Sequence, residues 1–279
     1  MNIDMRNILA AIMLLVCGGA AAQETVVPQL WDQGERFVRP NLTGISRIRF
    51  LTTVDFPPFN FIDANGLLTG FHVDLARALC RELDILDRCQ IQALPWEELE
   101  PALEKGEGEA LIAGLAVTPQ TRAKYAFTRS YMRFPARFVA RNGTSLGEPM
   151  WRAVSGRRVG VLAGSEHEAL LKDYFADAKP VPVEDEAKLH EELKAGRVDV
   201  AFGDGMRLAF WLASPASGNC CALAGGPYLA SEYLGGGLAI AVPQQQKELA
   251  EAFDYALREI NVNGVFGELY LRYFPVGFF

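Results

Sequence analysis

A unit of helix, glycine and strand occurs twice in this chain, and its repetition constrains the fold more than any other feature. Segments 99–114 (LEPALEKGEGEALIAG) and 189–204 (LHEELKAGRVDVAFGD) each place two leucines four residues apart, as on one helix face, and a glycine three residues later. An acidic residue then leads into a short apolar strand, and Gly114 and Asp204 follow the carboxyl ends of these strands. Ligands of α/β proteins gather beyond such strand ends. The repetition therefore predicts an α/β protein with two similar lobes facing each other across a cleft.

The segment after the first unit predicts an anion site. Thr118 and Pro119 form a helix start, because threonine caps the free N–H groups and proline lacks the donor that would stay unpaired. Arg122 adds a full positive charge within the first turns of this helix. The pattern suits a small carboxylate. An ordinary helix cap with a surface arginine is the alternative interpretation.

A similar start is expected in the second half of the chain. Ser165 and Glu168 have the Ser-x-x-Glu spacing of a capping box, so a helix should begin there and offer a second anion cradle. Asp204 supplies a carboxylate at the end of the repeated unit. The repeat favours a role for Asp204 in holding a cation over the alternative of a solvated loop carboxylate.

Two aromatic positions lie at other strand ends. Phe56 and Phe59 flank two prolines that fix the backbone, so Phe56 either forms a wall over a ligand or caps the core. Trp96 opens the helix 97–104. We expect Trp96 to belong to the core rather than to line the cleft.

The first residues indicate export. Arg6, an apolar run at 8–16 and three alanines at 20–22 have the order of a signal peptide cleaved near Ala22, which predicts a periplasmic protein. The net charge of −7 argues against nucleic acid and anionic membrane surfaces as partners. Residues 23–46 carry prolines without a clear period and should form an extended arm.

Four cysteines remain after such cleavage, in an oxidising compartment. Cys80 and Cys89 flank a helix end and the following turn, so a disulfide that closes a short loop is expected. Cys220 and Cys221 are adjacent and form either a vicinal disulfide or a pair of thiols. The three histidines show no ligand spacing with these cysteines, so neither a metal nor another cofactor is predicted.

These features together resemble the periplasmic solute-binding proteins of family 3, the receptors of polar-amino-acid ABC importers. The resemblance covers nearly all of residues 47–275 and rests on an ordered set of motifs: Phe56-x-Pro58-Phe59, Asn65-Gly66-x-x-x-Gly70-Phe71-x-x-Asp74-Leu75, Trp96, Gly114-x-x-x-Thr118-Pro119, Phe127-Thr128-x-x-Tyr131, Gly164-Ser165, Gly196-Arg197-Val198-Asp199 with Asp204, and the terminal Asn263-Gly264 and Tyr273-Phe274. It implies a type II periplasmic-binding-protein fold, in which each lobe is a mixed sheet flanked by helices and two hinge strands join the lobes. The expected division is a signal peptide (1–22), the arm (23–46), lobe 1 (47–133 and 233–279) and lobe 2 (134–232).

The resemblance also implies a ligand site. An aromatic residue at position 56 covers the ligand, the carboxylate at 204 with groups at 114 and 116 holds the α-amino group, and an arginine with the helix start near 165 holds the α-carboxylate. Two positions depart from this pattern, because Thr121 stands where the family has its arginine and Ala116 lacks the usual hydroxyl. Arg122 comes one residue later, a step of about 100° around a helix. The candidate ligand-binding residues are Phe56, Gly114, Ala116, Thr121, Arg122, Ser165 and Asp204.

The function implied is a receptor that captures a small polar ligand, an amino acid or a derivative, and delivers it as a monomer to an ABC permease of the inner membrane. The departures at 116 and 121 extend the ligand candidates to an altered amino acid, a decarboxylated amine or something larger. An enzyme on the same scaffold, similar to cyclohexadienyl or arogenate dehydratases, is the main alternative. Glu166 and His167 are then the nominees for the general acid. A sensory binding protein is the third possibility.

Overall fold

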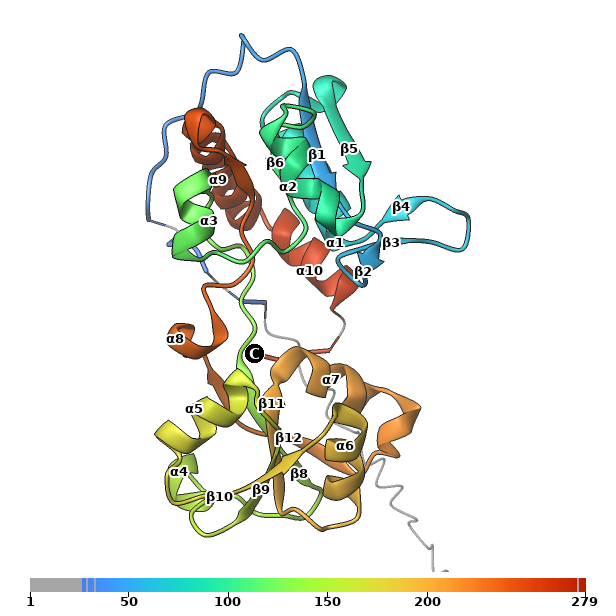
Figure 1. Cartoon of the computed structure of the whole chain (residues 1–279), viewed down its shortest axis with the longest axis vertical. Coiled ribbons are helices and arrows are strands. Elements are labelled where there is room, and N and C mark those ends of the chain that lie inside the picture. The colour runs from blue at the N-terminus through green and yellow to red at the C-terminus, as the bar shows by residue number, and fades with distance from the viewer. Residues whose placement is uncertain (1–26, 29, 33, 275) are drawn as a thin grey trace, which may run out of the picture.

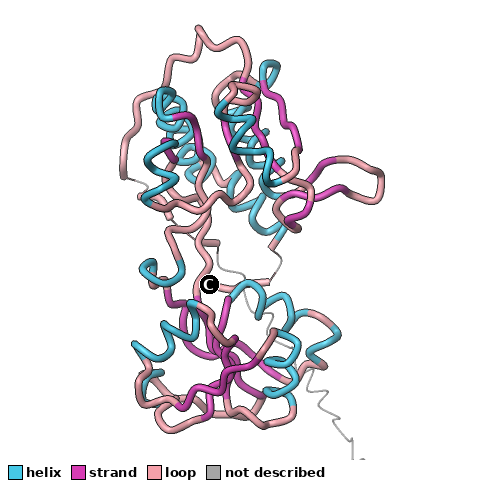
Figure 2. Tube along the Cα trace, viewed as in Figure 1, coloured by secondary structure: helices cyan, strands magenta, loops and turns pink. Residues whose placement is uncertain are grey.

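The computed structural model describes residues 27–28, 30–32, 34–274 and 276–279, so the expected signal peptide lies outside the described part. Two α/β units, lobe 1 above and lobe 2 below in Figure 1, are each built on one five-stranded sheet. The secondary-structure view shows helices on both sides of each sheet and a narrow waist of loops and strands between the units (Figure 2). The α/β class and the two-lobed architecture expected from the repeat are confirmed.

Lobe 1 has the strand order β5-β1-β6-β13-β7, and its first three strands are parallel. The strands are β1 (Ile48–Thr52), β5 (Cys89–Ala93), β6 (Ala110–Leu111), β7 (Tyr125–Phe127) and β13 (Ala241–Pro243). The helices are α1 (Phe71–Glu82), α2 (Trp96–Glu104), α3 (Pro119–Lys124), α9 (Lys247–Val262) and α10 (Val265–Tyr273). A small hairpin sheet of β2 (Asp55–Phe56), β3 (Asn60–Ile62) and β4 (Leu68–Thr69) extends from it.

Lobe 2 has the strand order β10-β9-β11-β8-β12. The strands are β8 (Ala136–Arg141), β9 (Arg158–Leu162), β10 (Lys179–Val183), β11 (Val200–Asp204) and β12 (Cys221–Tyr228). The helices are α4 (Met150–Ala153), α5 (Glu166–Tyr174), α6 (Glu186–Lys194), α7 (Gly205–Ala213) and α8 (Ser231–Leu234). In both lobes a repeated helix–strand pair, α2–β6 or α6–β11, contributes a central strand, as the sequence repeat predicts.

The predicted helix starts are confirmed. The Thr118 side chain accepts a hydrogen bond from the backbone N–H of Thr121, and Ser165 accepts one from that of Glu168. Gly264, two residues after the end of α9, takes a left-handed conformation (φ 84°), which glycine adopts more readily than other residues do.

Two elements between residues 205 and 228 were not predicted. Helix α7 is apolar on more than one side, because Leu208 and Trp211 pack in the lobe 2 core while Ala209 joins the lobe 1 core. Strand β12 (CALAGGPY) consists mostly of small residues and two glycines, which have low strand propensity, and it is irregular after Ala224.

The two lobes are joined by paired segments. Leu238 donates its N–H to the carbonyl of Met132 (2.7 Å), and Tyr131 donates to the carbonyl of Leu238 (2.9 Å), so the outgoing and returning chains pair as they cross. The C-terminal residues add a third contact. Phe278 is buried in the lobe 1 core, and its carbonyl accepts a hydrogen bond from Arg137 Nη1 of β8 (3.5 Å).

Two disulfides are present among the described residues. Cys80, in α1, is bonded to Cys89 at the start of β5, across a short loop. Cys220 and Cys221 are bonded to each other, which decides between the two states that the sequence left open. The described residues include no helix with the length and apolar character needed to cross a membrane.

Candidate functional site

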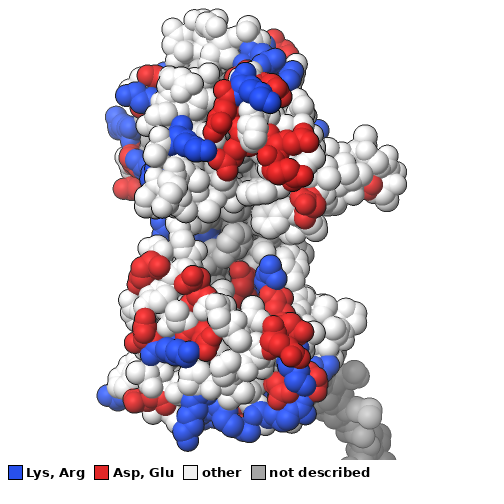
Figure 3. Space-filling model, in the orientation of Figure 1, with Lys and Arg blue, Asp and Glu red and all other residues white. Residues whose placement is uncertain are grey.

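Each lobe carries a pocket at the carboxyl ends of its strands. The pockets are formed by β2 and the first residue of α2 in lobe 1 and by β11, α5, α6 and α7 in lobe 2. In Figure 1, β2 and α7 lie on the sides of the lobes that face each other. In the space-filling view the molecule is hollowed at the waist, and acidic side chains gather on both lobes around the hollow (Figure 3). The lining residues of the two pockets are separate, as expected of an open cleft with two half-sites.

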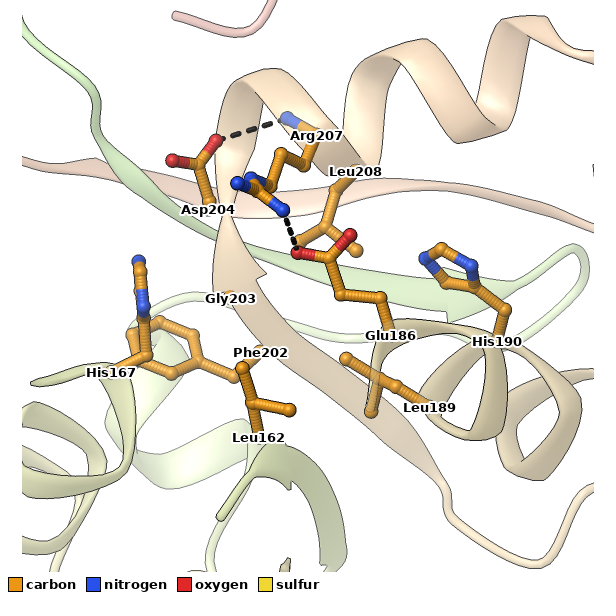
Figure 4. Close-up of a pocket in the computed structure, with 10 residues that line it drawn as sticks. All are labelled: Leu162, His167, Glu186, Leu189, His190, Phe202, Gly203, Asp204, Arg207 and Leu208. Carbon is orange, nitrogen blue, oxygen red and sulfur yellow. Dashed lines mark hydrogen bonds and ion pairs between the residues drawn. The ribbon is translucent and has the colours of Figure 1, made fainter. Parts of the chain in front are cut away.

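The lobe 2 pocket has a volume of about 320 Å³ and combines an apolar floor with charged walls (Figure 4). Its lining residues are Leu162, His167, Glu186, Leu189, His190, Phe202, Gly203, Asp204, Arg207 and Leu208. Arg207 donates to Glu186 (2.8 Å), and this ion pair neutralises the guanidinium. The carboxylate of Asp204 is therefore left as the uncompensated charge of the pocket lining.

Asp204 holds its position through the helix that follows it. It is the N-cap of α7, and its Oδ1 accepts the backbone N–H of Arg207 (2.9 Å). The second carboxylate oxygen is not used by this cap, and Figure 4 shows it pointing away from the helix above His167. A capped carboxylate with a free oxygen is preorganised for a charge-assisted hydrogen bond from an ammonium or guanidinium group.

The two histidines add no compensating positive charge at neutral pH. Burial lowers the pKa of His167, and the nearby Asp204 only partly opposes this effect. Burial also lowers the pKa of His190, whose ring stacks on Trp211 at 4.1 Å. Both imidazoles are therefore neutral at pH 7, and the pocket keeps its negative character.

The lobe 1 pocket has a volume of about 340 Å³, and two aromatic side chains, Phe56 and Trp96, contribute to its lining. Its lining residues are Thr53, Asp55, Phe56, Trp96, Ala113 and Gly114. Phe56 stacks on Phe59 (4.7 Å between ring centroids), which fixes its orientation. The prediction that Trp96 belongs to the core is wrong. Its side chain is 50% exposed, because it starts α2 at the rim of the sheet, where it faces the pocket instead of a neighbouring layer.

The loop after β6 is held by hydrogen bonds among its own residues. Gly114 has a positive φ (87°) and lies against Phe56, so a Cβ there would meet the phenylalanine ring at 3.4 Å. The hydroxyl of Thr121 donates to the carbonyl of Ala116 (2.7 Å) and accepts from the backbone N–H of Thr118 (2.9 Å). Thr121 thus stabilises the loop, and its hydroxyl is already used within the loop.

The position of Arg122 agrees with the alternative of a surface arginine. The Cζ atom of Arg122 lies 5.9 Å from the ring centroid of Phe127 in β7, and Arg122 is not one of the residues that line either pocket. At the start of α5, Gly164 donates its N–H to Glu168 Oε2 (2.7 Å), so a carboxylate of the chain already uses this donor. Ser165 caps the same helix, and its side chain accepts from Glu168 N (3.2 Å).

Several lining residues were missed by sequence reasoning. Asp55 follows the first strand, and Glu186 and Arg207 lie in the first turns of helices after strands. Their positions at strand and helix ends are a usable signal. However, the Glu186–Arg207 pairing joins α6 to α7 and depends on the packing of two helices, which the sequence does not display.

The model of the bacterial extracellular solute-binding proteins, family 3, matches residues 48–276. The chain belongs to this family. A putative ABC transporter arginine-binding protein 2 of Escherichia coli K12 is 33% identical over 234 residues, covering 83% of this chain and 92% of that protein. The ABC transporter arginine-binding protein 1 of the same strain is 30% identical, covering 84% and 93%. Both relatives are thus named as arginine-binding proteins of ABC transporters.

Solved structures support the fold. The L-cystine solute receptor of Neisseria gonorrhoeae, in its unliganded open conformation, aligns with a TM-score of 0.70 at 20% identity and covers 83% of this chain and 94% of its own. An ancestral cyclohexadienyl dehydratase aligns with a TM-score of 0.67 at 21% identity, covering 84% and 95%. At these identities the likeness shows the two-lobed fold and nothing of the ligand.

Proposed function

We propose that this chain is the periplasmic receptor of an ABC importer and captures a small cationic ligand between its lobes. The uncompensated carboxylate of Asp204, at the pocket that faces lobe 1, carries this proposal. The ligand's amino group binds Asp204, and its body packs against Phe56 and Trp96 when the lobes close. The permease of the inner membrane is the proposed destination of the ligand.

The basic character of the ligand agrees with the relatives. Two of them are named arginine-binding proteins, and a basic amino acid or derivative suits a cleft with acidic groups on both sides. Asp55 in lobe 1 and Asp204 in lobe 2 face the cleft, whereas Arg207 is paired with Glu186.

We further propose that the ligand lacks a free carboxylate. A ligand carboxylate in this cleft meets the charges of Asp55 and Asp204, while Arg207 is paired and Arg122 lies over Phe127, so neither guanidinium balances it. A buried anion without a partner is strongly disfavoured. Amines and neutral derivatives of basic amino acids are therefore the proposed ligand class.

A matched series of compounds tests this proposal. The three compounds differ at one position. L-Arginine carries a carboxylate there, agmatine carries hydrogen, and L-argininamide carries a neutral amide. Isothermal titration calorimetry should give tighter binding for agmatine and L-argininamide than for L-arginine. Tighter binding of L-arginine would show that its carboxylate has a partner and would exclude the carboxylate-free ligand class. If all three fail to bind, the cationic ligand itself is wrong.

The same protein should not catalyse a dehydration. A dehydratase needs a general acid in the cleft, and His167 is a poor one because burial keeps its imidazole neutral. Incubation with prephenate or arogenate, followed by absorbance, should show no aromatisation. Turnover would replace the receptor proposal with an enzymatic one.

A further inference from the structure

A chain of buried hydrogen bonds leads from the core of lobe 1 to its pocket. The ring of His72, in α1, has Nε2 2.9 Å from the hydroxyl of Tyr131 and Nδ1 2.8 Å from Oδ1 of Asn60. Asn60 Nδ2 donates to Oγ1 of Thr53 (2.6 Å). Thr53 is only 3% exposed, and it lines the pocket beside Phe56. The chain thus connects a tyrosine deep in the core to the pocket wall.

The direction of this chain follows from the protonation of His72. Burial lowers the pKa of His72 to about 3, so the ring is neutral at pH 7 and carries one N–H. The amide oxygen of Asn60 only accepts hydrogen bonds, so this N–H is on Nδ1. Nε2 is then an acceptor, and the hydroxyl of Tyr131 donates to it.

If the hydrogen-bond chain ran in the opposite direction, from Thr53 towards Tyr131, the buried hydroxyl of Tyr131 would be a donor without an acceptor. With the Asn60 amide turned over, His72 would donate from Nε2 to Tyr131, and the tyrosine proton would need another partner. Tyr131 is fully buried, and within the described residues its hydroxyl has no other hydrogen-bond partner. An unsatisfied buried hydroxyl is costly, so the direction from Tyr131 towards Thr53 is favoured.

We propose that this chain makes Thr53 a hydrogen-bond donor in the lobe 1 pocket and selects ligands with an oxygen acceptor at that end. Because Oγ1 of Thr53 accepts from Asn60, its own proton is not used in the chain, and in the described structure that proton has no acceptor. A neutral oxygen, such as a carbonyl or a hydroxyl, fits this donor better than a carboxylate, since Asp55 lines the same pocket.

This inference rests on the proposed function for the presence of a ligand in the cleft, but the chain can be tested without one. Nitrogen-15 NMR of the ligand-free protein should show the His72 proton on Nδ1 and an unprotonated, hydrogen-bonded Nε2. In Tyr131→Phe the Nε2 resonance should shift, because it loses its donor, while Nδ1 stays protonated. A proton on Nε2 in the wild type would reverse the chain, make Thr53 an acceptor and overturn the proposal.

Binding tests the consequence for the ligand. Wild-type protein should prefer L-argininamide, which carries a neutral carbonyl, over agmatine. Thr53→Val should lose about fivefold of this preference, the value of one neutral hydrogen bond, whereas Thr53→Ser should keep it. A Thr53→Val variant that retains the full preference for L-argininamide would contradict the proposal. The Thr53→Ser variant is the control for a valine variant that folds poorly.

The neighbouring residue supplies a matched control. Thr52 is equally buried, but its hydroxyl donates to the carbonyl of Ile112 (2.8 Å), and it does not line the pocket. Thr52→Val should therefore lower stability without changing the preference, and an equal loss of preference in both valine variants would assign the effect to the fold. If neither compound binds the wild type, the proposed ligand class is wrong, and the NMR result alone decides whether Thr53 is a donor.

Discussion

At the scale of single residues, Asp204 has two roles that one substitution can separate. It caps α7 through Oδ1 and offers its negative charge to the pocket. Asp204→Asn keeps the capping ability, since asparagine caps about as well as aspartate, but removes the charge. We expect it to weaken binding of a cationic ligand by at least about thirtyfold, within the roughly 2–5 kcal/mol typical of a lost buried charge partner. Calorimetry measures this loss, and thermal unfolding should change little.

A second helix cap provides the control for this substitution. Asp185 caps α6 through Lys188 N (2.7 Å) in the same lobe, but it is exposed and is not a lining residue of the pocket. Asp185→Asn should bind the ligand as the wild type does. Similar affinities of the Asp204 and Asp185 variants would contradict the role of Asp204.

Arg122 is expected to contribute little to binding. Its guanidinium lies over the ring of Phe127 rather than in a pocket, in agreement with the one-residue shift relative to the family pattern. Arg122→Ala should leave the dissociation constant within about twofold, because the substitution removes an exposed cation–π pair that stabilises the fold by about 0.5–1 kcal/mol and does not involve the ligand. Calorimetry with the wild-type ligand measures this constant. Abolished binding in this variant would show that Arg122 turns into the cleft on closure.

The sequence predicted the local parts of the candidate site better than the rest. The caps at Thr118 and Ser165 depend on residues within one helical turn, and both form as predicted. The chain from Tyr131 to His72 joins residues 59 positions apart and was not predicted. Trp96 was misplaced for the same reason, because only the packing of α2 determines which side of the sheet rim its ring faces.

At the scale of elements, the N-terminal arm is fastened to lobe 1 around one arginine. Arg129 lies 5.6 Å from the ring centroid of Trp31 and 5.0 Å from that of Phe37, and it forms an ion pair with Glu35 through both terminal nitrogens. Arg129→Ala should lower the free energy of unfolding by about 1–2 kcal/mol, the sum of two cation–π contacts and an exposed ion pair. Urea unfolding measures it. Arg39→Ala, which removes only the exposed pair with Asp84, should cost less than about 0.5 kcal/mol, and equal effects would argue against the arm contacts.

The buried carboxyl group of Asp254 in helix α9 predicts that the stability of the protein depends on pH. Burial raises the pKa of Asp254 from 3.8 to about 6, although the backbone N–H of Arg129 (2.8 Å from Oδ1) opposes the shift. Between about pH 4 and 6 the folded state therefore binds more protons than the unfolded state, and the contribution of Asp254 to stability falls as the pH rises. Asp254→Asn removes this loss. The free energy of unfolding of the variant, relative to that of the wild type, should therefore rise by on the order of 2 kcal/mol between about pH 4 and about pH 7. A constant difference between the two proteins in urea unfolding would contradict the raised pKa.

Amphipathic elements could be predicted from the sequence, whereas elements that serve both lobes could not. Leu249, Phe253, Leu257 and Ile260 recur at helical spacing in the sequence, which is sufficient to predict α9, and these residues are buried. Helix α7 has no single apolar stripe, because Trp211 packs within lobe 2 while Ala209 joins the lobe 1 core. Because α7 packs against both lobes, its sequence pattern does not predict a helix. The same packing places Asp204 next to the junction of the lobes.

At the scale of the whole molecule, the contacts at this junction predict that ligand binding and lobe movement are coupled. Helix α7 begins at Asp204, and its Phe210 contacts Phe274, whose neighbour Phe278 lies between the lobe 1 core and Arg137 of lobe 2. The crossing segments pair at Met132 and Leu238, so we expect the lobes to bend about this place. Hinge closure about few residues is a common response of two-lobed proteins to ligand.

Closure should follow from binding across two separate half-sites. A ligand held by Asp204 reaches Phe56 and Trp96 only if the lobes approach, because the two pockets share no lining residue among those described. Small-angle scattering of the protein after signal-peptide removal should show a smaller radius of gyration with saturating agmatine, moving toward the roughly 18 Å of a compact chain of this length. Contacts that the ligand makes only in the closed state favour closure. The Asp204→Asn variant lacks one of these contacts, so it should stay open at the same agmatine concentration. An unchanged radius in the wild type, with binding confirmed by calorimetry, would mean that one lobe alone holds the ligand.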